Sequence, residues 1–303
     1  MVDTWYKPAA SGGQILSRLE VYNATICAMV ELSLQEWNSK QPRNTFRRAS
    51  GVGIQVAGAG YQVKSIMWTL YIVVSKFMES QEHFAEAEFK TRVKEEIYGF
   101  GRYFEKLSRG NHNRLDSTPP ENSTLDAGAI GSEQITTSSA SSPMTDLTIS
   151  NHTATSLDTR LNAKDAVDFR AEWILNGKIY NARQVLSTIM KLIIDIGEED
   201  PEHYSAGIAY YKTDGDFHIL VHATSQAARE NLKNYVVVFA LQACADGLMR
   251  AAPGGRWQEF NGIIRWYAKI VGKILLRRGK LQPPPVLDDG AGLVDGENVA
   301  AVA

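Results

Sequence analysis

The sequence predicts an α+β protein made of two tandem ferredoxin-like units, each with an antiparallel sheet. Three observations support this prediction: short matches recur between the two halves of the 303-residue chain, a Ser- and Thr-rich stretch separates the halves, and each half shows the element order β-α-β-β-α-β plus one extra strand. The composition, with 44% hydrophobic and 22% charged residues, is that of a globular protein long enough for two domains.

The predicted domains are a first unit at residues 1–107 and a second unit at residues 165–278. Between them, residues 108–164 lose hydrophobic periodicity and fill with Ser, Thr, Asn and Gly, so they cannot bury enough apolar surface to offset their ordering entropy. We predict a disordered linker there. Residues 279–303, which contain three consecutive prolines and then several acidic residues, are predicted to form a disordered tail for a similar reason.

The duplication is inferred from matches whose spacing grows along the chain. The matched pairs are Asn23 and Asn181 at a shift of 158, Ile54 and Ile219 at 165, and Glu86 and Glu259 at 173. A shift that grows in one direction is expected after loop insertions in the second copy, whereas chance matches would show shifts that vary in no consistent direction. A competing register pairs residues 14–17 with residues 184–187 at a shift of 170, and it breaks this order.

In the first half, alternation and helical spacing predict seven elements in order. These are a strand at 14–20, a helix at 23–37, strands near 46 and at 52–57, a helix at 63–79, and strands at 84–93 and 97–104. The glycine-rich residues 51–60 suggest a phosphate loop, but their spacing does not fit the dinucleotide pattern and no Gly-Lys-Ser/Thr follows. We interpret them as strand glycines and a strand-to-helix turn.

The second half predicts a similar series of elements. These are a strand at 169–175 ending in an Asn-Gly turn, a helix over 185–196, a hairpin of 206–212 and 217–222, a helix at 227–250, and strands at 258–266 and 270–276. This order is typical of a split βαβ unit, in which both helices cover one face of the sheet. Since a large bare sheet face is rare in a soluble monomer, we expect the other copy to cover it.

Composition and charge exclude several classes of protein. The chain has two cysteines, Cys27 and Cys244, each in an apolar helical stretch, which predicts buried, unreactive thiols and a reducing compartment. The N-terminus shows no secretory pattern, and the apolar runs at 66–74 and 235–245 are far shorter than the roughly 20 residues that span a bilayer. We expect an intracellular protein, cytoplasmic or nuclear, without a membrane span.

No catalytic motif is found, and we predict no catalytic residue, metal site or cofactor. The leading hypothesis is a non-enzymatic module, built as an internal pseudo-dimer, that binds a protein partner or assembles with itself. The rival is a small-ligand site or enzyme in a cavity between the two sheets, for which the candidate residues are His218, His222, Trp173 and Tyr267. Strand geometry places the two histidines roughly 13 Å apart, too far to bind one metal ion.

RNA binding is the third hypothesis, because RNA-recognition domains share the β-α-β-β-α-β order. The residues 217–222 lack the aromatic pattern of such domains, and the net charge of −2 gives no overall field for phosphates, so nucleic acid is not a favoured partner. Basic residues do gather near the last strands: Arg256, Arg265, Lys269, Lys273, Arg277, Arg278 and Lys280. Such residues are also ordinary protection against edge-to-edge aggregation.

Two segments resemble known sequences. They are Phe84-Ala85-Glu86-Ala87-Glu88-Phe89 with Gly99-Phe100-Gly101, and Trp257-Gln258-Glu259-Phe260 with Val271-Gly272. They are similar to the last strand pair of a set of predicted filamentous-fungal proteins, which show an F-x-E-x-E-F strand followed by a G-x-G strand. That set has no assigned activity, so the resemblance implies a fungal intracellular protein and no functional residue.

Overall fold

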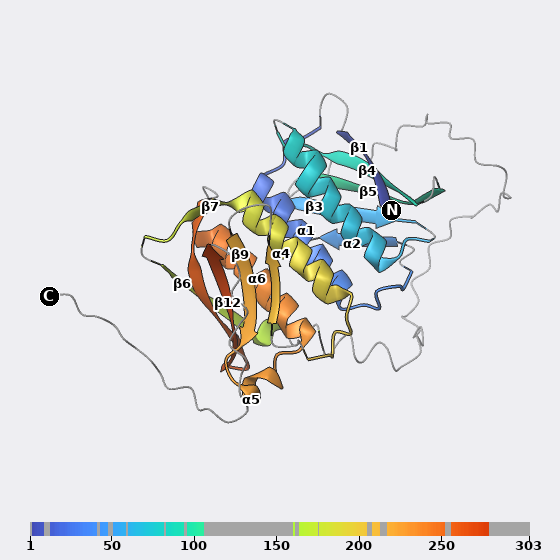
Figure 1. Ribbon diagram of the computed structural model, residues 1–303. Coiled ribbons are helices and arrows are strands. Elements are labelled where there is room, and N and C mark those ends of the chain that lie inside the picture. The colour runs from blue at the N-terminus through green and yellow to red at the C-terminus, as the bar shows by residue number, and fades with distance from the viewer. Residues whose placement is uncertain are drawn as a thin grey trace, which may run out of the picture.

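The computed structural model describes residues 2–8, 13–40, 43–47, 51–58, 60–81, 83–93, 96–105, 160, 164–174, 176–204, 208–212, 217–251 and 256–278. These residues form two α+β units with antiparallel sheets, as the sequence predicts (Figure 1). The predicted linker, apart from Arg160 and Lys164, and the predicted tail lie outside the described residues.

The first unit contains one five-stranded sheet and two long helices. Its elements are β1 (Val2–Pro8), α1 (Arg18–Ser33), β2 (Arg43–Arg47), β3 (Val52–Ala57), α2 (Val63–Ile72), β4 (Ala87–Val93) and β5 (Glu96–Glu105). Helix α2 continues into a π-helical turn, η1 (Val73–Phe77), and a 3-10 turn, η2 (Met78–Ser80). The strand order is β1-β4-β5-β3-β2, and every neighbouring pair is antiparallel.

The second unit repeats this plan. Its elements are a 3-10 turn, η4 (Lys164–Ala166), β6 (Val167–Trp173), β7 (Ile179–Asn181), α4 (Ala182–Gly197), β8 (Ile208–Lys212), β9 (Phe217–Ala223), α5 (Gln226–Arg229), α6 (Asn234–Ala251), β10 (Arg256–Gln258), β11 (Phe260–Trp266) and β12 (Lys269–Arg278). The strand order β6-β11-β12-β9-β8 matches that of the first unit, and β7 pairs with β10 as a separate ribbon. The chain therefore contains two copies of one fold.

The strand order differs from the predicted ferredoxin-like arrangement. In a ferredoxin-like sheet the first strand lies in the interior, whereas β1 and β6 lie at a sheet edge and the last strands, β5 and β12, lie in the middle. The reason is that the last two strands of each unit pair as a hairpin, which inserts between the first strand and the preceding hairpin. The element order alone does not distinguish these two arrangements.

The sheet registers agree with two of the predicted shifts. Gly99 pairs with Thr91 and Gly272 pairs with Ile264, and a β-bulge follows Thr91 in one hairpin and Ile264 in the other, which is the shift of 173. In the neighbouring strands, β3 and β9 align at the predicted shift of 165, because Val56 opposite Gly101 corresponds to Val221 opposite Ile274. The conserved bulge shows that the correspondence extends to local backbone geometry.

The predicted shift of 158 was wrong. Asn23 lies inside α1, whereas Asn181 is the residue before α4 and its side chain caps that helix. The counterpart of Asn181 is Ser17, directly before α1, so the shift at the helix start is 164. The predicted opening strand at residues 14–20 was also wrong, because α1 begins at Arg18 and Ile15 forms only an isolated bridge.

Two further boundaries differ from the prediction. The opening strand of the first unit is β1, whose alternating residues were not recognised. The helix predicted at 227–250 is divided into α5 and α6, because the chain turns at residues 230–233 between them.

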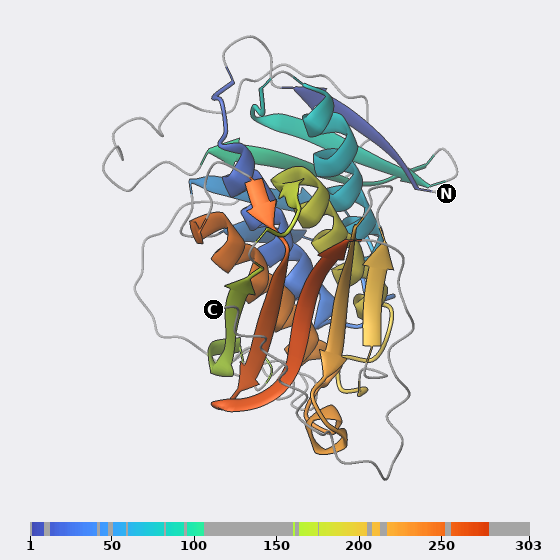
Figure 2. The same ribbon diagram turned by 60° about the vertical axis from the view of Figure 1, so that its left-hand side comes forward.

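The two units meet through their helices and form four layers in the order sheet, helices, helices, sheet (Figures 1 and 2). Helices α1 and α2 contact the first sheet, and α4 and α6 contact the second. Between the units, α1 packs against α4 and α6, and α2 packs against α4. The expectation that each bare sheet face is covered by the other copy was wrong, since the helices lie between the sheets.

The helices can fill the middle of the molecule because most of their residues are buried. Eleven of the sixteen residues of α1 are buried, and so are eleven of the sixteen of α4, a pattern typical of helices inside a core. Cys27 and Cys244 form no disulfide and are buried there, which confirms the prediction that both thiols are buried. Gln242 of α6 donates to the Cys27 Sγ at 2.8 Å across the junction. No helix in the described part of the chain is long and apolar enough to span a membrane.

Candidate functional site

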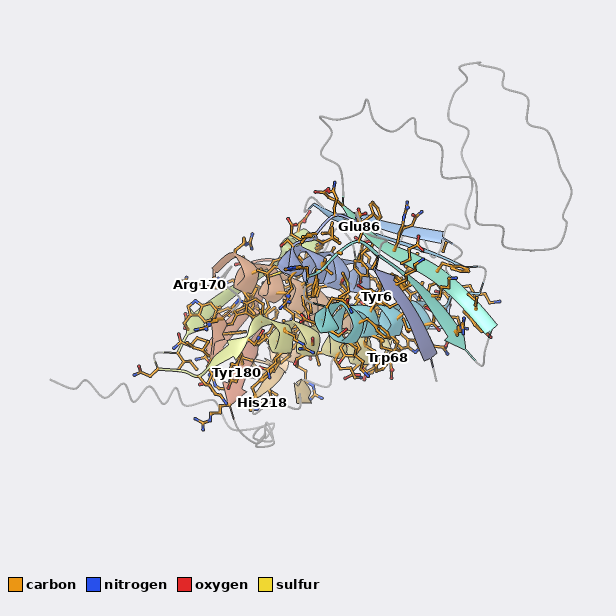
Figure 3. The ribbon with its side chains drawn as sticks, turned by 90° about the horizontal axis from the view of Figure 1, so that it is seen from above. Tyr6, Trp68, Glu86, Arg170, Tyr180 and His218 are labelled. Carbon is orange, nitrogen blue, oxygen red and sulfur yellow. The ribbon has the colours of Figure 1, made fainter. Side chains whose placement is uncertain are left out.

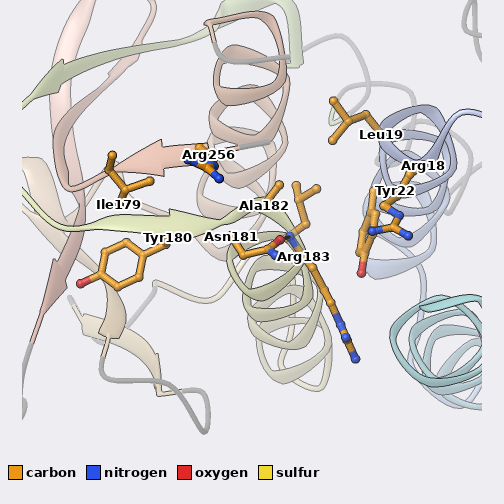
Figure 4. A pocket seen from close by; sticks show the side chains of 10 residues that line it. Arg18, Leu19, Tyr22, Ile179, Tyr180, Asn181, Ala182, Arg183 and Arg256 are labelled. Atoms are coloured by element: carbon orange, nitrogen blue, oxygen red, sulfur yellow. Dashed lines mark hydrogen bonds between the residues drawn. The ribbon is translucent and has the colours of Figure 1, made fainter. Parts of the chain in front are cut away.

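A hollow of about 600 Å³, here called the junction pocket, lies where the first turns of α1 and α4 meet (Figure 4). Its lining residues are Arg18, Leu19 and Tyr22 of α1, Ile179, Tyr180 and Asn181 of β7, Ala182, Arg183 and Leu186 of α4, and Arg256 of β10. The pocket therefore takes one wall from each unit, and it exists only because the two units pack together.

Both helix starts give the junction pocket a positive electrostatic environment. No side chain caps the first turn of α1, since Ser17 makes no such hydrogen bond. In α4, the Asn181 Oδ1 accepts a hydrogen bond from the Arg183 amide at 2.9 Å. Unpaired first-turn amides and the helix dipole both favour an anion at these ends.

Three arginines contribute most of the charge. Arg18 and Arg183 each lie 3.7 Å from the Glu79 carboxylate, whose side chain is only 3% exposed. The third, Arg256, is exposed and forms no ion pair with a described residue. Arg18 and Arg183 thus share one carboxylate and Arg256 adds a third guanidinium group, which leaves a surplus of positive charge around the pocket.

The Glu79 cluster, consisting of Arg18, Tyr22, Glu79 and Arg183, joins the two units. The Tyr22 hydroxyl donates to the Glu79 Oε1 at 2.9 Å. Burial raises the pKa of Tyr22 far above its usual value, so the hydroxyl stays protonated and acts as a donor. Arg183 also donates to the Ser75 carbonyl at 3.4 Å, which connects α4 to the end of α2.

The junction pocket has the chemistry of a binding site. Its lining residues include no His, Cys, Asp, Glu or Lys, and its buried tyrosine, Tyr22, is a poor base because its pKa is raised. Across the described residues, no group of three or more His, Cys, Asp or Glu side chains is placed to hold a metal ion. Guanidinium groups and helix amides recognise carboxylates and phosphates without reacting with them.

The structure does not bring the four sequence-predicted site residues together. His218 and His222 lie on β9 and alternate with inward-facing Phe217, Ile219 and Val221, so they occupy the outer sheet face. Figure 3 shows where this face lies: Arg170, which is on the same outer face, is far from Trp68 and Tyr6 of the first unit. The two histidines therefore face away from the helices and from the junction pocket.

The two predicted aromatic residues lie elsewhere. Trp173 is on the edge strand β6 and contacts Phe260 on the helix side, with ring centroids 5.9 Å apart. Two strands separate β6 from β9. Tyr267 is 64% exposed in the β11–β12 turn, with a left-handed φ of 47°. None of the four predicted residues lines the junction pocket.

The predicted basic stripe is divided between two places. Arg256 lines the junction pocket, whereas Arg265 and Lys273 lie on β11 and β12, two interior strands of the second sheet. Arg265 is 3.6 Å from Asp168 of the edge strand β6. Lys280 lies outside the described residues.

Sequence reasoning missed Arg18 and Arg183 as site residues. A usable signal was present, because both arginines stand in the first turn of a helix, Arg18 one residue after Ser17 and Arg183 two residues after Asn181. The helix dipole favours acidic residues at that position and disfavours basic ones. A basic residue in the first turn of both α1 and α4 therefore indicates a role other than helix stability.

Comparison with known proteins adds little to this description. No protein-family model and no curated protein matches the chain. Among solved structures, the chain is similar to the tandem DUF26 ectodomain of the Arabidopsis thaliana cysteine-rich receptor-like protein PDLP5, with 11% sequence identity over 91% of this chain and 98% of that chain. The TM-score is 0.24, and at that value the similarity supports no conclusion about function.

Proposed function

We propose that the protein binds a small anionic ligand in the junction pocket. The observation that carries this proposal is the set of three guanidinium groups, from Arg18, Arg183 and Arg256, that surround a hollow of about 600 Å³ with one carboxylate among them. The volume falls in the usual range for small-molecule sites, about 300 to 1,000 Å³. The ligand class that fits is a phosphate or carboxylate compound.

The arginines differ in what they offer this ligand. Arg18 and Arg183 are already oriented by Glu79, which reduces the entropy lost when an anion is bound. Arg256 is exposed on the wall that the second unit contributes, and it forms no ion pair with a described residue. An anion between the walls would therefore contact both units. Arg18 and Arg183 already have Glu79 as a partner, so Arg256 would gain most from the charge of the ligand.

The test is calorimetric titration of the full chain with inorganic phosphate and inorganic pyrophosphate at low salt. We expect Arg256→Gln to weaken binding of the better ligand by roughly 10-fold or more, since a hydrogen bond to a charged group contributes about 1.5 to 3 kcal/mol. Added NaCl should weaken binding for the same electrostatic reason. Arg256 is exposed, so the substitution should leave the thermal stability unchanged.

The matched control is Arg170→Gln, which removes an exposed arginine from the outer face of the second sheet. It should bind the anion as tightly as the unmodified protein does. If neither anion binds at low salt, or if both substitutions weaken binding equally, the junction pocket is not an anion site.

The role as a protein-interaction or self-assembly module stays a prediction. The packing of the units leaves the outer face of each sheet directed away from the helices, so partners of this kind would meet the sheets rather than the junction pocket.

A further inference from the structure

A second hollow, of about 380 Å³, lies on the outer face of the first sheet and is here called the platform. Its lining residues are Gln55 and Ala57 of β3, Glu88, Phe89 and Lys90 of β4, and Phe100, Gly101 and Arg102 of β5. The sheet separates the platform from α1, so it is a different site from the junction pocket.

An exposed aromatic ring forms part of the platform. Phe100 is 45% exposed although it stands in the central strand of a five-stranded sheet. Strand alternation places Phe104 on the same face, four residues further along β5 and roughly 13 Å away. The neighbouring positions opposite Phe100 are Lys90 and Ala57, so no bulky apolar side chain covers the ring from these strands.

Cations stand beside both rings. The Lys90 Nζ lies 5.6 Å from the centroid of the Phe100 ring, and the Arg102 guanidinium lies 5.1 Å from the centroid of the Phe104 ring. The Arg102 Nε donates to the Gln55 Oε1 at 2.9 Å, which fixes the guanidinium over the sheet. A single carboxylate, that of Glu88, lines the hollow with these two cations.

The second unit shows that the fold does not require these aromatic residues. At the confirmed shift of 173, Phe100 corresponds to Lys273 and Phe104 corresponds to Arg277. Both sheets have the same strand order and bulge, so a basic residue is compatible with either position. The Phe104 ring lies over Gly53 of β3, where an added Cβ would be 2.5 Å from the ring, so it covers a glycine. The exposed Phe100 ring is therefore the feature of the first unit that sheet packing does not explain.

We propose that the platform binds single-stranded nucleic acid, with one base stacked on Phe100 and the adjacent phosphates contacted by Lys90 and Arg102. Aromatic rings on an open sheet stack against any base, and flanking cations hold the sugar-phosphate backbone. Lysine is a flexible point charge, so Lys90 leaves the ring for a phosphate when a base takes its place. Gln55 and Glu88 supply hydrogen-bonding groups at the edge of the stacked base.

A single strand suits the platform better than a duplex does. The faces of bases are accessible only when they are not stacked inside a double helix, whereas a duplex presents mainly phosphates to a flat surface. A strand that follows β5 passes Phe100 and then Phe104, each with its own cation.

The test is fluorescence anisotropy of a labelled single-stranded oligouridine with the full chain at low salt. We expect Phe100→Ala to weaken binding by roughly 5- to 150-fold, the range measured when one stacking ring is removed. Phe100→Trp keeps a ring at the same position and should retain binding. Circular dichroism of both variants should match the unmodified protein, because the ring is 45% exposed.

Two substitutions serve as controls. Ile97→Ala removes a side chain of similar exposure, 46%, from the same strand and should leave binding unchanged. Arg256→Gln should also leave it unchanged, which separates the platform from the junction pocket. The proposal is overturned if the oligonucleotide does not bind at low salt, if Phe100→Ala binds as well as the unmodified protein, or if a matched duplex binds as tightly as the single strand.

Discussion

The Glu79 carboxylate holds two arginines that belong to different units. Its own side chain is 3% exposed, while Arg18 and Arg183 are 50% and 49% exposed. Water screens the outer side of each ion pair, so the net stabilisation from each is modest. The buried carboxylate also accepts a hydrogen bond from the Tyr22 hydroxyl, and this neutral donor offsets part of its desolvation.

We expect Glu79→Gln to change stability and anion affinity in opposite directions. Loss of the carboxylate leaves both arginines without their partner and should lower the free energy of unfolding by about 1 to 3 kcal/mol. The same change removes the negative charge beside the junction pocket, so inorganic phosphate should bind several-fold more tightly. Urea unfolding and calorimetric titration measure the two effects.

The control for this residue is Glu172→Gln, an exposed carboxylate on the outer strand β6, which should alter neither quantity. Weaker phosphate binding in Glu79→Gln would contradict this prediction, because it would mean that the orientation of the arginines by the carboxylate outweighs the effect of its negative charge. A loss of stability alone, with unchanged affinity, would show that Arg18 and Arg183 do not contact the ligand.

At the scale of elements, the π-helical turn η1 explains where Glu79 lies. It wraps five residues, Val73–Phe77, at the end of α2 and is followed by the 3-10 turn η2, which contains Glu79. Each change of helix type rotates the following residues relative to a regular α-helix. The Ser75 carbonyl inside η1 accepts a hydrogen bond from Arg183, so the irregular turn also contacts the second unit directly.

The sequence predicted some of these elements and not others, for physical reasons. Periodicity located α4 and β3 because burial on one face leaves a local signal. The π turn has no such signal, and neither does the strand order, which depends on contacts between residues far apart in the chain. The junction pocket was missed for the same reason, since Arg183 and Glu79 meet only after the two units have packed.

The loop between α4 and β8 is held by an ionic group that titrates. The Glu202 carboxylate accepts hydrogen bonds of 2.8 Å from both Lys233 and Arg160, and Arg160 also donates to the Leu34 carbonyl at the end of α1. Burial alone would raise the pKa of Glu202, but the hydrogen bonds from Lys233 and Arg160 outweigh it and lower the pKa below its usual 4.5. The loop is thereby linked to both units.

Because the pKa of Glu202 is lowered in the folded protein, its ionised carboxylate stabilises the fold above pH 4.5. This stabilisation is lost as the pH falls through the lower pKa of the folded state. We expect Glu202→Gln to be less stable than the unmodified protein at about pH 7, by about 0.5 kcal/mol, because a side chain that is 41% exposed is well screened. The difference should shrink as the pH falls below 4.5, because protonation of Glu202 leaves both proteins with a neutral side chain. Urea unfolding across this range measures it.

If the difference in free energy of unfolding between Glu202→Gln and the unmodified protein stays constant from neutral to acid pH, this account of Glu202 is contradicted. The control is Glu198→Gln at the end of α4, whose carboxylate makes no ion pair with a described residue and should show no such pH-dependent difference.

At the scale of the whole molecule, the two copies share one helical interior. Helix α1 packs against β3 of its own unit and against α4 and α6 of the other. Because nearly all of its sides are buried, separating the units would expose apolar surface along its length. The two sheets are therefore outer layers of one core rather than the cores of independent domains.

The end of α4 is one place where the two units approach each other closely. A Cβ atom added to Gly197 would lie 3.2 Å from the Ser33 Cβ and 3.4 Å from the Met67 Cε, both in the first unit. The distance to the Ser33 Cβ is shorter than an ordinary van der Waals contact, so the close approach of the helices depends on the missing side chain at position 197. Gly247 of α6 is a contrasting case, since a Cβ there would meet nothing nearer than the Phe169 Cδ1 at 3.8 Å.

We therefore expect Gly197→Val to lower the free energy of unfolding by about 1 to 3 kcal/mol, the usual cost of overpacking. Gly247→Ala, in the middle of α6, should raise it by about 0.5 to 1 kcal/mol, because alanine is the better helix former and its methyl group has room. Urea unfolding followed by tryptophan fluorescence measures both. A Gly197→Val protein as stable as the original would mean that α4 and the first unit do not pack in solution, and the junction pocket between them would then not exist.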